Sequence, residues 1–321
     1  MVAHYTNTFP ATAVYMIGDV DTAINGYSIV PAESGSLTGT LTYPASYHGG
    51  PLATDSASQM YVAVAVDPID PLNLGDIFIY PPNSTGAAIP SRTININSYQ
   101  ASALAVDPAG LLYVAINTGS AEDAPPPMVS VYSATASGTA TPLRTLQLTG
   151  IFPTGAGDIA ADAAGNIYVA GYTGTGNVIA VCPPTATGPA TPVRTISLGS
   201  SNVYGVAVDP DGHIFASVRP DCFGSAAFVI EEFASGADGE AAPINTIDLP
   251  VAAGWAIVNG GPVRLDGTGN IFTSLQRRSS TDPGALDSIV VYGFKSTATG
   301  STAPTVQIAP TDGYDTFFVV N

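Results

Sequence analysis

The sequence feature that most constrains the fold is a short pattern close to Asp-x-x-Gly-x-(Ile/Leu)-(Tyr/Phe), which recurs along the chain. Five aspartates each end an apolar run and stand six positions before an aromatic residue: Asp55, Asp107, Asp162, Asp209 and Asp266. A glycine follows four of them by three positions, and Ser58 takes its place in the first copy. A unit that returns about every fifty residues is typical of solenoids and propellers.

The chemistry of the pattern is that of a β-hairpin turn. Aspartate at the first turn position accepts hydrogen bonds from backbone N–H groups a few residues later. Glycine at the fourth position adopts the left-handed conformation that such a loop needs. The five aspartates could instead form a ring of metal ligands. We favour the turn interpretation, because each aspartate occurs together with its glycine or serine.

Each hairpin is followed by two more predicted strands, so the repeat is a four-stranded unit with strands A to D. In the clearest copy these strands are predicted at residues 103–106, 111–115, 129–132 and 142–148. The same position of strand D holds an arginine in three copies: Arg92, Arg144 and Arg194. We interpret these arginines as structural side chains that lie on neighbouring units. Cys182 occupies an aromatic core position of strand C, which predicts an inert buried thiol.

The two ends of the chain are complementary halves of one more unit. Residues 13–17 resemble a strand B with no strand A before it, and residues 316–320 resemble a strand A with no hairpin after it. Asn321 would take the place of the repeated aspartate. A solenoid would cap its ends with polar repeats, whereas complementary ends close a ring and remove free sheet edges.

The predicted fold is therefore all-β: a six-bladed β-propeller of four-stranded antiparallel blades, closed by pairing of the N- and C-terminal segments in one shared blade. Residues 1–321 form a single propeller domain in this prediction. The shared blade takes residues 1–49 and 311–321, and the other blades lie at about 50–98, 101–149, 156–199, 203–249 and 260–309.

Two copies of the motif carry a family resemblance. The segments Val206–Phe215 (VAVDPDGHIF) and Ala105–Gly110 (AVDPAG) resemble the NHL repeat. This resemblance covers nearly the whole chain and implies the six-bladed fold. The NHL-like group includes ligand-binding modules, lyases and structural domains, and related six-bladed folds include metal-dependent lactonases of the gluconolactonase type.

Composition restricts the partners. The chain has 25 acidic and 8 basic residues, a formal net charge of −17 and one lysine, Lys295. Nucleic acids and anionic membranes need clustered basic residues, so neither is an expected partner. The sequence contains no stretch of about 18 apolar residues, so no membrane-spanning segment is expected. The composition resembles that of bacterial exported or surface proteins, and the N-terminus shows no signal peptide. We expect an extracellular or cell-surface protein whose signal has been removed, with the cytoplasm as the alternative.

The loops that connect strand D to the next strand A, and strand B to strand C, are expected to carry the function, because they vary most. Each D–A connection contains an aromatic residue: Tyr47, Tyr99, Phe152, Tyr204, Trp255 and Tyr314. These rings could form a platform for a sugar or peptide, or they could only pack the loops onto the blades. Trp255 is the strongest candidate for contact with a ligand. Arg219, Arg277 and Arg278 lie in B–C loops and could hold a carboxylate or remain solvated.

Catalytic motifs are scarce, and no catalytic residue is predicted. No metal-binding histidine spacing, nucleophile elbow or phosphate loop occurs, and Cys222 has no evident histidine partner. The candidate oxygen ligands for Ca²⁺ are Glu122, Asp123, Asp158, Asp221 and Asp312, although their spacing does not require an ion. We therefore expect no cofactor and a non-enzymatic propeller that binds a protein or a glycan on its loops, or packs as a subunit of a surface assembly. The alternative is a lyase or lactonase-like hydrolase with a divalent cation at the channel mouth.

Overall fold

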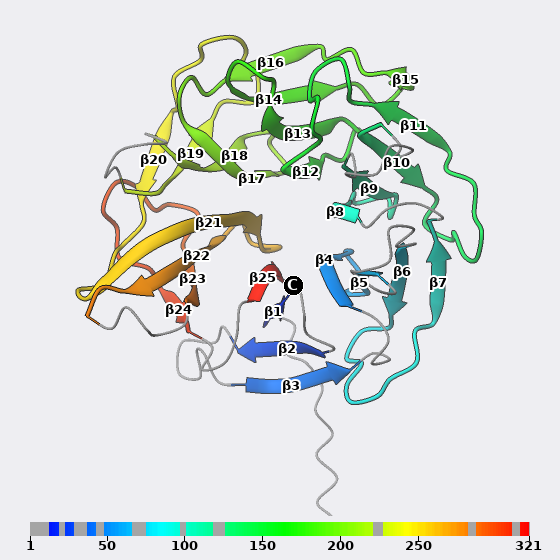
Figure 1. Ribbon diagram of the computed structural model, residues 1–321, viewed down its shortest axis with the longest axis horizontal. Coiled ribbons are helices and arrows are strands. Elements are labelled where there is room, and N and C mark those ends of the chain that lie inside the picture. The colour runs from blue at the N-terminus through cyan, green and yellow to red at the C-terminus, as the bar shows by residue number, and fades with distance from the viewer. Residues whose placement is uncertain are drawn as a thin grey trace, which may run out of the picture.

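The chain folds into β-sheets that stand around a common axis, as the blades of a propeller do (Figure 1). The computed structural model describes residues 13–18, 23–28, 37–42, 48–65, 75–96, 101–117, 126–220, 227–281, 287–309 and 315–320. All of the regular elements in these ranges are strands.

Five of the sheets have four strands each, and in every one the strands follow one another outward from the axis. They are β25 (Asp315–Val320), β1 (Ala13–Gly18), β2 (Ala23–Ser28) and β3 (Leu37–Thr42); β4 (His48–Thr54), β5 (Met60–Ala65), β6 (Gly75–Tyr80) and β7 (Arg92–Asn95); β12 (Asp158–Ala161), β13 (Ile167–Tyr172), β14 (Asn177–Cys182) and β16 (Arg194–Ser197); β17 (Asn202–Val208), β18 (Ile214–Arg219), β19 (Val229–Phe233) and β20 (Asn245–Asp248); and β21 (Trp255–Leu265), β22 (Ile271–Ser279), β23 (Ser288–Phe294) and β24 (Val306–Ile308).

The prediction of six four-stranded antiparallel blades is wrong, because the remaining sheet has five strands of mixed direction. It contains β8 (Ala101–Val106), β9 (Leu112–Ile116), β10 (Met128–Tyr132), β11 (Arg144–Gln147) and β15 (Gly188–Pro189). The short strand β15 pairs parallel with β11 at the outer edge. In sequence it belongs to the turn between β14 and β16. This turn of the following blade thus reaches back and covers an edge that would otherwise be open.

The same contact recurs between other blades as a single parallel bridge. The C–D turn of each later blade meets the outer strand of the blade before it in the pairs Leu41–Gly86, Ile94–Gly138, Ile196–Gly239 and Ile247–Gly300. At one such junction Gly138 N–H donates to Thr93 O at 2.6 Å, and Asn95 N–H donates to Gly138 O at 2.8 Å. The C–D turns therefore connect neighbouring blades at the perimeter.

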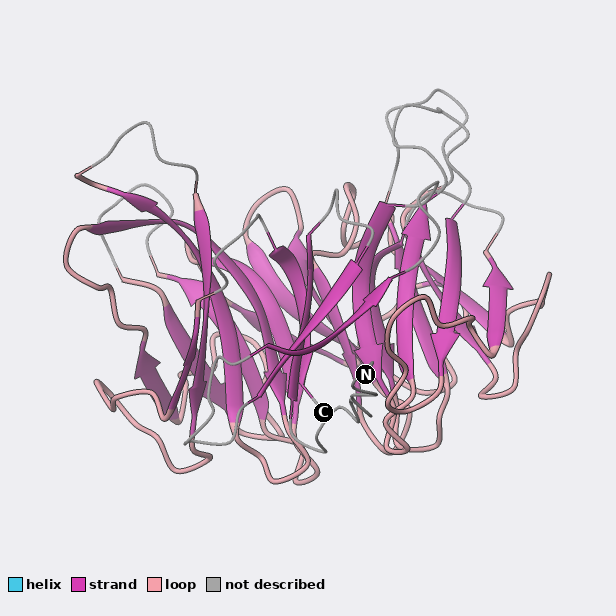
Figure 2. Cartoon of the chain, turned by 90° about the horizontal axis from the view of Figure 1, so that it is seen from below, coloured by secondary structure: helices cyan, strands magenta, loops and turns pink. Residues whose placement is uncertain are grey.

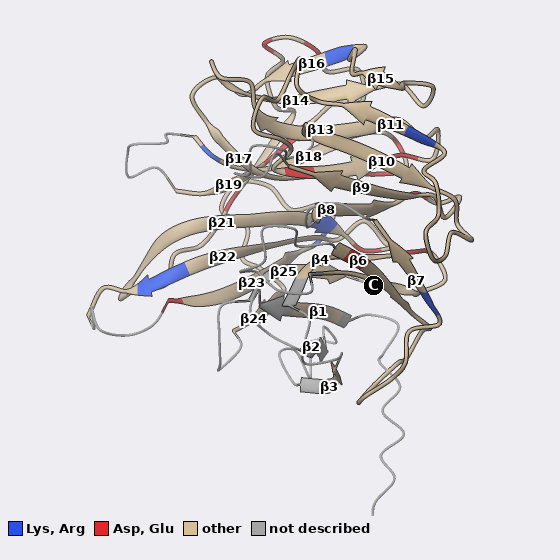
Figure 3. Cartoon of the chain, turned by 45° about the vertical axis from the view of Figure 1, so that its right-hand side comes forward, with Lys and Arg blue, Asp and Glu red and all other residues tan. Residues whose placement is uncertain are grey.

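The repeated arginines of the outer strands strengthen these junctions. Figure 3 shows basic residues on β7, β11 and β16 at the edge of the ring. Arg92 Nη1 donates to Ala136 O at 2.9 Å, and Arg144 Nη1 donates to Ala186 O at 3.0 Å. Each acceptor is a backbone carbonyl of the next blade's C–D turn. The prediction that these arginines lie on neighbouring units is confirmed.

The ring closes where the two ends of the chain meet. Strand β25 pairs antiparallel with β1, and Val14 is opposite Val320 while Tyr15 is opposite Val319. This is the predicted pairing of the N- and C-terminal segments. It places both ends in one sheet and leaves no open first or last blade. Asn321 lies outside the described residues.

The repeated aspartates form the hairpin turns that the sequence predicts. Asp107 Oδ1 accepts hydrogen bonds from the N–H groups of Ala109 and Leu111, both at 2.9 Å. Its Oδ2 accepts from Tyr113 Oη at 3.0 Å, and burial with this carboxylate raises the pKa of Tyr113. Gly110 has a φ of +83°, and Ser58 adopts +61° at the same position of the first copy. The aspartates are therefore turn-forming residues.

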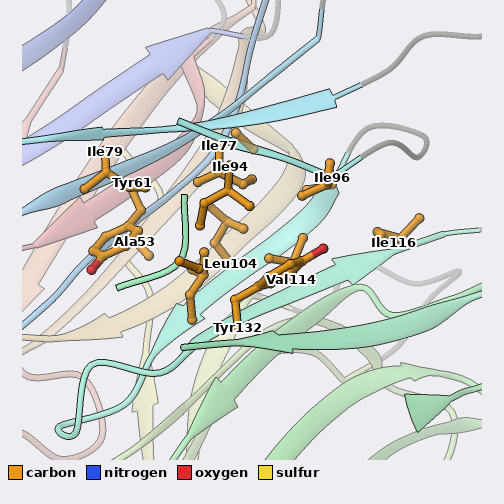
Figure 4. Packing of buried hydrophobic residues seen from close by; sticks show 14 residues of the cluster. Ala53, Tyr61, Ile77, Ile79, Ile94, Ile96, Leu104, Val114, Ile116 and Tyr132 are labelled. Atoms are coloured by element: carbon orange, nitrogen blue, oxygen red, sulfur yellow. The ribbon is translucent and has the colours of Figure 1, made fainter. Parts of the chain in front are cut away.

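The apolar core lies between the blades. Figure 4 shows one layer, in which Ile77 and Ile94 of one blade pack against Leu104 and Val114 of the next. Every blade is covered on both faces in this way, which explains strands that are apolar throughout. Cys182 belongs to such a layer, and burial raises its pKa to about 11. The prediction that this thiol is buried is confirmed, and its low reactivity stays a prediction.

Candidate functional site

The ring has two faces of different character. The aspartate turns lie at the ends of the inner strands on one face, which we call the turn face. The first residues of the strands A and the last residues of the strands B lie on the other, which we call the loop face. Figure 2 shows the ring from the side, with the strands crossing it from face to face. Five of the predicted ligand contacts lie on strand segments at this face: Tyr204, Arg219, Trp255, Arg277 and Arg278.

Inside the ring, an ion pair joins two inner strands that are not neighbours. Arg264 on β21 donates from Nη1 to Asp158 Oδ2 at 2.7 Å and from Nη2 to Asp158 Oδ1 at 3.1 Å. Asp158 lies on β12, and β17 stands between the two strands. Its Oδ2 also accepts from Val206 N–H of β17 at 3.0 Å. Asp158 is 3% exposed. The pair thus ties three blades together around the axis.

Two cavities lie beside this ion pair. The first has a volume of about 180 Å³ and is lined by the loop-face ends of the inner strands, including Ser102, Tyr204 and Asn259. The second has a volume of about 160 Å³ and is lined by the turn-face ends of the same strands. Arg264 lines both cavities. We call the first cavity the mouth pocket.

Uncharged polar groups are prominent in the mouth pocket beside the ion pair. Ser274 is 3% exposed and contributes a hydroxyl group, and Gln276 contributes a carboxamide that also donates to Asp287 Oδ2 at 3.2 Å. Among the described residues, the Asn259 side chain has no hydrogen-bond partner. Tyr204 supplies an aromatic wall, and its ring packs against Phe228 with 5.4 Å between centroids.

A second feature of the loop face is a two-stranded extension of β21 and β22, formed by residues 255–258 and 277–279. Figure 1 shows these two strands reaching outward from the axis. Trp255 is opposite Ser279 at the end of this ribbon. The guanidinium of Arg277 lies over the Trp255 ring, 4.2 Å from its centroid, and its Nε donates to Ser288 Oγ at 3.2 Å. The ribbon therefore presents a pre-assembled tryptophan–arginine pair.

The structure separates the predicted site residues into groups. Tyr204 lines the mouth pocket, and Trp255 and Arg277 form the ribbon pair. The guanidinium carbon of Arg219 lies over the Phe228 ring, 5.5 Å from its centroid. Arg278 is paired with Asp287, where Nε–Oδ1 is 2.6 Å, and this guanidinium lowers the pKa of Asp287.

Phe152 is fully buried in the core between two blades, so its ring packs inside and does not reach the loop face. Tyr47, Tyr99 and Tyr314 lie outside the described residues. The D–A aromatics that the structure describes thus occupy three different environments rather than one shared rim.

Three residues of the mouth pocket were not predicted from the sequence: Arg264, Asn259 and Gln276. A comparison of the repeats contains the signal for Arg264. It stands two residues before its turn aspartate, where Ala53, Ala105, Ala160 and Ala207 stand in the other copies. A charge at a position that is otherwise alanine, on the innermost strand, indicates a residue directed toward the axis.

The candidate calcium ligands do not assemble in the described part of the chain. Glu122, Asp123, Asp221 and Asp312 lie outside it, and the Asp158 carboxylate is engaged by Arg264. On the turn face, Asp209, Asp211 and His213 bring three ligand atoms within 4.8 Å of one another. His213 Nδ1 is 3.1 Å from Asp209 Oδ2, and the backbone N–H of His213 donates to Asp209 Oδ1 at 2.8 Å. These contacts build the hairpin turn.

No protein-family model and no curated protein sequence matches the chain. Solved structures do resemble it. A protein of unknown function from Bacteroides caccae aligns with a TM-score of 0.61 and 9% identity, covering 96% of this chain and 98% of its own. A protein from Lactobacillus plantarum has a TM-score of 0.52 and 13% identity, with coverages of 97% and 99%. Regucalcin, a calcium-binding protein from Agrobacterium tumefaciens, has a TM-score of 0.50 and 13% identity, with coverages of 91% and 92%.

These likenesses and the ring of sheets define the class of the protein as an all-β propeller. At such low identity they show the fold alone, and the resemblance to the NHL repeat stays an expectation. In the described residues, no helix is both long enough and apolar enough to cross a membrane.

Proposed function

We propose that the protein is a non-enzymatic binding propeller that recognises a protein or a glycan on its loop face, either alone or as a subunit of a surface assembly. The observation that carries this proposal is the Trp255–Arg277 pair on the β21–β22 ribbon, with 4.2 Å between the guanidinium and the ring centroid. The low charge content of the chain and its single lysine support an extracellular or cell-surface location.

The pair has the properties of an interface anchor. Tryptophan and arginine, together with tyrosine, are enriched among the interface residues that contribute most to binding energy. Stacking and the hydrogen bond from Arg277 to Ser288 hold both side chains before a partner arrives, so less conformational entropy is lost on binding. Val251 and Val258 are exposed nearby in sequence, at 46% and 37%. The ribbon thus combines apolar surface with one oriented cation.

The alternative is an enzyme, a lyase or lactonase-like hydrolase with a divalent cation at the channel mouth. The likeness to calcium-binding regucalcin concerns the fold. In the described part of the chain, the carboxylate in the mouth pocket already accepts two hydrogen bonds from Arg264. A cation bound there would have to displace the guanidinium. We therefore rank calcium-dependent chemistry second.

The proposal is tested by a glycan array and by a pull-down of surface proteins with the purified chain. Trp255→Ala and Arg277→Gln should each lose most of the signal, because they remove the aromatic surface and the cation separately. Tyr172→Ala is the matched control, since Tyr172 is an exposed aromatic at the loop-face end of β13. If Trp255→Ala lowers stability but leaves binding intact, the pair is packing and the proposal fails.

Calcium titration by calorimetry tests the alternative in the same preparation. A stoichiometric heat signal that EDTA abolishes, together with loss of binding on Asp158→Asn, would favour the enzyme over the binding module.

A further inference from the structure

We infer that the mouth pocket binds a single neutral sugar residue, at a site separate from the Trp255–Arg277 pair. The pocket lies at the loop-face end of the channel, on the inner strands, whereas the pair lies at the end of the ribbon. Neither site needs the other, so this inference goes beyond the ribbon and does not rest on it.

The size of the pocket restricts the ligand to one ring. Its volume of about 180 Å³ is below the roughly 300–1,000 Å³ of sites for drug-sized molecules. Asp158 and Arg264 both line this pocket, and we take them as its floor because Arg264 also lines the cavity beyond. A longer glycan or a peptide could enter only with its terminal residue.

The charges at the floor favour a neutral ligand. Asp158 and Arg264 neutralise each other through two hydrogen bonds, at 2.7 and 3.1 Å. An ionic ligand would lose its hydration without meeting an uncompensated charge, which is unfavourable. A neutral ligand with hydroxyl groups exchanges hydrogen bonds with water for hydrogen bonds with the pocket at little net loss.

The groups on the walls are complementary to hydroxyls. A carboxamide both donates and accepts hydrogen bonds, as a hydroxyl group does. The carboxamide of Asn259 has no hydrogen-bond partner among the described residues, so all of its donors and acceptors are open to a ligand. Ser102 and Ser274 add hydroxyl groups. This mixture matches a sugar, in which each hydroxyl is at once a donor and an acceptor.

The aromatic wall distinguishes a sugar from a simple polyol. The Tyr204 ring is partly buried and is held by the Phe228 ring at a tilt of 45°. A fixed ring offers an apolar face on which the C–H face of a pyranose can pack while its hydroxyls point to Asn259 and the serines. A flexible polyol has no such flat apolar face.

The test is a titration of the ¹⁵N-labelled full chain with free glucose, galactose, mannose and N-acetylglucosamine, with glucuronate and glucosamine as charged probes. At least one neutral sugar should shift the amides of Gly260 and Gly261 with a Kd on the order of 10 mM or tighter. Asn259→Ala should weaken binding at least about tenfold, because it removes the free carboxamide. Asn259 is exposed, so this substitution should leave the fold intact.

Ser102→Ala is a second pocket variant, and it should weaken binding in the same direction. Tyr172→Ala is the control, and it should leave sugar binding within about twofold of the parent. The inference is overturned if no neutral sugar binds, if glucuronate or glucosamine binds more tightly, or if Asn259→Ala has no effect. Loss of sugar binding on Trp255→Ala would instead assign the sugar to the ribbon.

Discussion

Breaking the Asp158–Arg264 pair should destabilise the ring more than the loss of any exposed charge. Arg264→Ala leaves Asp158 buried, with only the hydrogen bond from Val206 N–H. Removing one partner of a buried ion pair costs about 3–5 kcal/mol. The Arg264 side chain is 18% exposed, so water reaches part of the site. We therefore expect Arg264→Ala to lower the free energy of unfolding by an amount near the lower end of that range, about 3 kcal/mol.

The reciprocal and combined substitutions separate charge from packing. Asp158→Asn leaves a cation that can turn toward the two adjoining cavities, so its effect should be smaller, about 1–2 kcal/mol. Replacing the pair by Asp158→Ala with Arg264→Leu removes both charges together. That double variant should lie within about 1 kcal/mol of the parent, which makes the coupling energy strongly favourable.

The assay is urea unfolding at pH 7, followed by far-UV circular dichroism. For Arg264→Ala the urea concentration at the midpoint of unfolding should fall. The dependence of the unfolding free energy on urea should stay constant, because a native contact is lost and the denatured state is unchanged. Lys295→Ala is the control, since Lys295 is exposed and should shift stability by no more than about 0.5 kcal/mol. A similarly small shift for Arg264→Ala would show that Asp158 is solvated, and it would refute this account of the channel.

Three further predictions follow from single side chains. Tyr80→Phe should be neutral or stabilising in urea unfolding, because the buried Tyr80 hydroxyl has no partner among the described residues, whereas Tyr113→Phe should cost about 1–2 kcal/mol by removing the hydrogen bond to its turn aspartate. Cys182 should resist a thiol reagent at pH 8 until the chain unfolds, since burial raises its pKa to about 11; rapid labelling of the native chain would contradict this. Arg278 lowers the pKa of Asp287, so their pairing should stabilise the fold above the unfolded carboxyl pKa of about 3.9 and be lost as the pH falls through the depressed value. An NMR titration in which Arg278→Ala leaves the Asp287 pKa unchanged would contradict that assignment.

The elements that the sequence predicts well depend on local chemistry. An aspartate followed by a left-handed glycine encodes a turn within seven residues, and Asp107, Gly110 and Tyr113 occupy that geometry. Closure of the ring follows from counting the strands at each end of the chain, and β25 does pair with β1. The first inference uses information that lies within one repeat, and the second uses only the number of strands at the two ends of the chain.

The fifth strand of one sheet was missed because its contact is made by the backbone of a turn. Gly188 and Pro189 carry no strand pattern, and their partner β11 precedes them by about forty residues in the chain. The signal was the glycine present in each C–D turn, with φ near +60° at Gly138, Gly188 and Gly239. A glycine that recurs at one turn position indicates that the backbone there adopts a left-handed conformation, which other residues rarely adopt.

The site was predicted only in part, because its geometry is tertiary. Asp158 and Arg264 are 106 positions apart, and only the ring brings them together. Phe152 and Trp255 occupy equivalent connections in the sequence. However, the Phe152 ring packs in the core against Gly171 of β13, which has no side chain. A Cβ added at Gly171 would come within 2.8 Å of this ring, so the ring fits there only because the residue is glycine. No spacing rule distinguishes these two aromatics.

The pairing of the two chain ends carries the account, since both proposed sites lie on a ring that this pairing closes. Val14 and Val320 are buried and directly opposite each other on β1 and β25, so their Cβ atoms should be about 4.5–5.5 Å apart. In a sample with labelled valine methyl groups, the account predicts a strong cross-peak between Val14 and Val320 in a nuclear Overhauser spectrum. Absence of that cross-peak, with the methyls of Val320 close to a different strand, would contradict the closed ring.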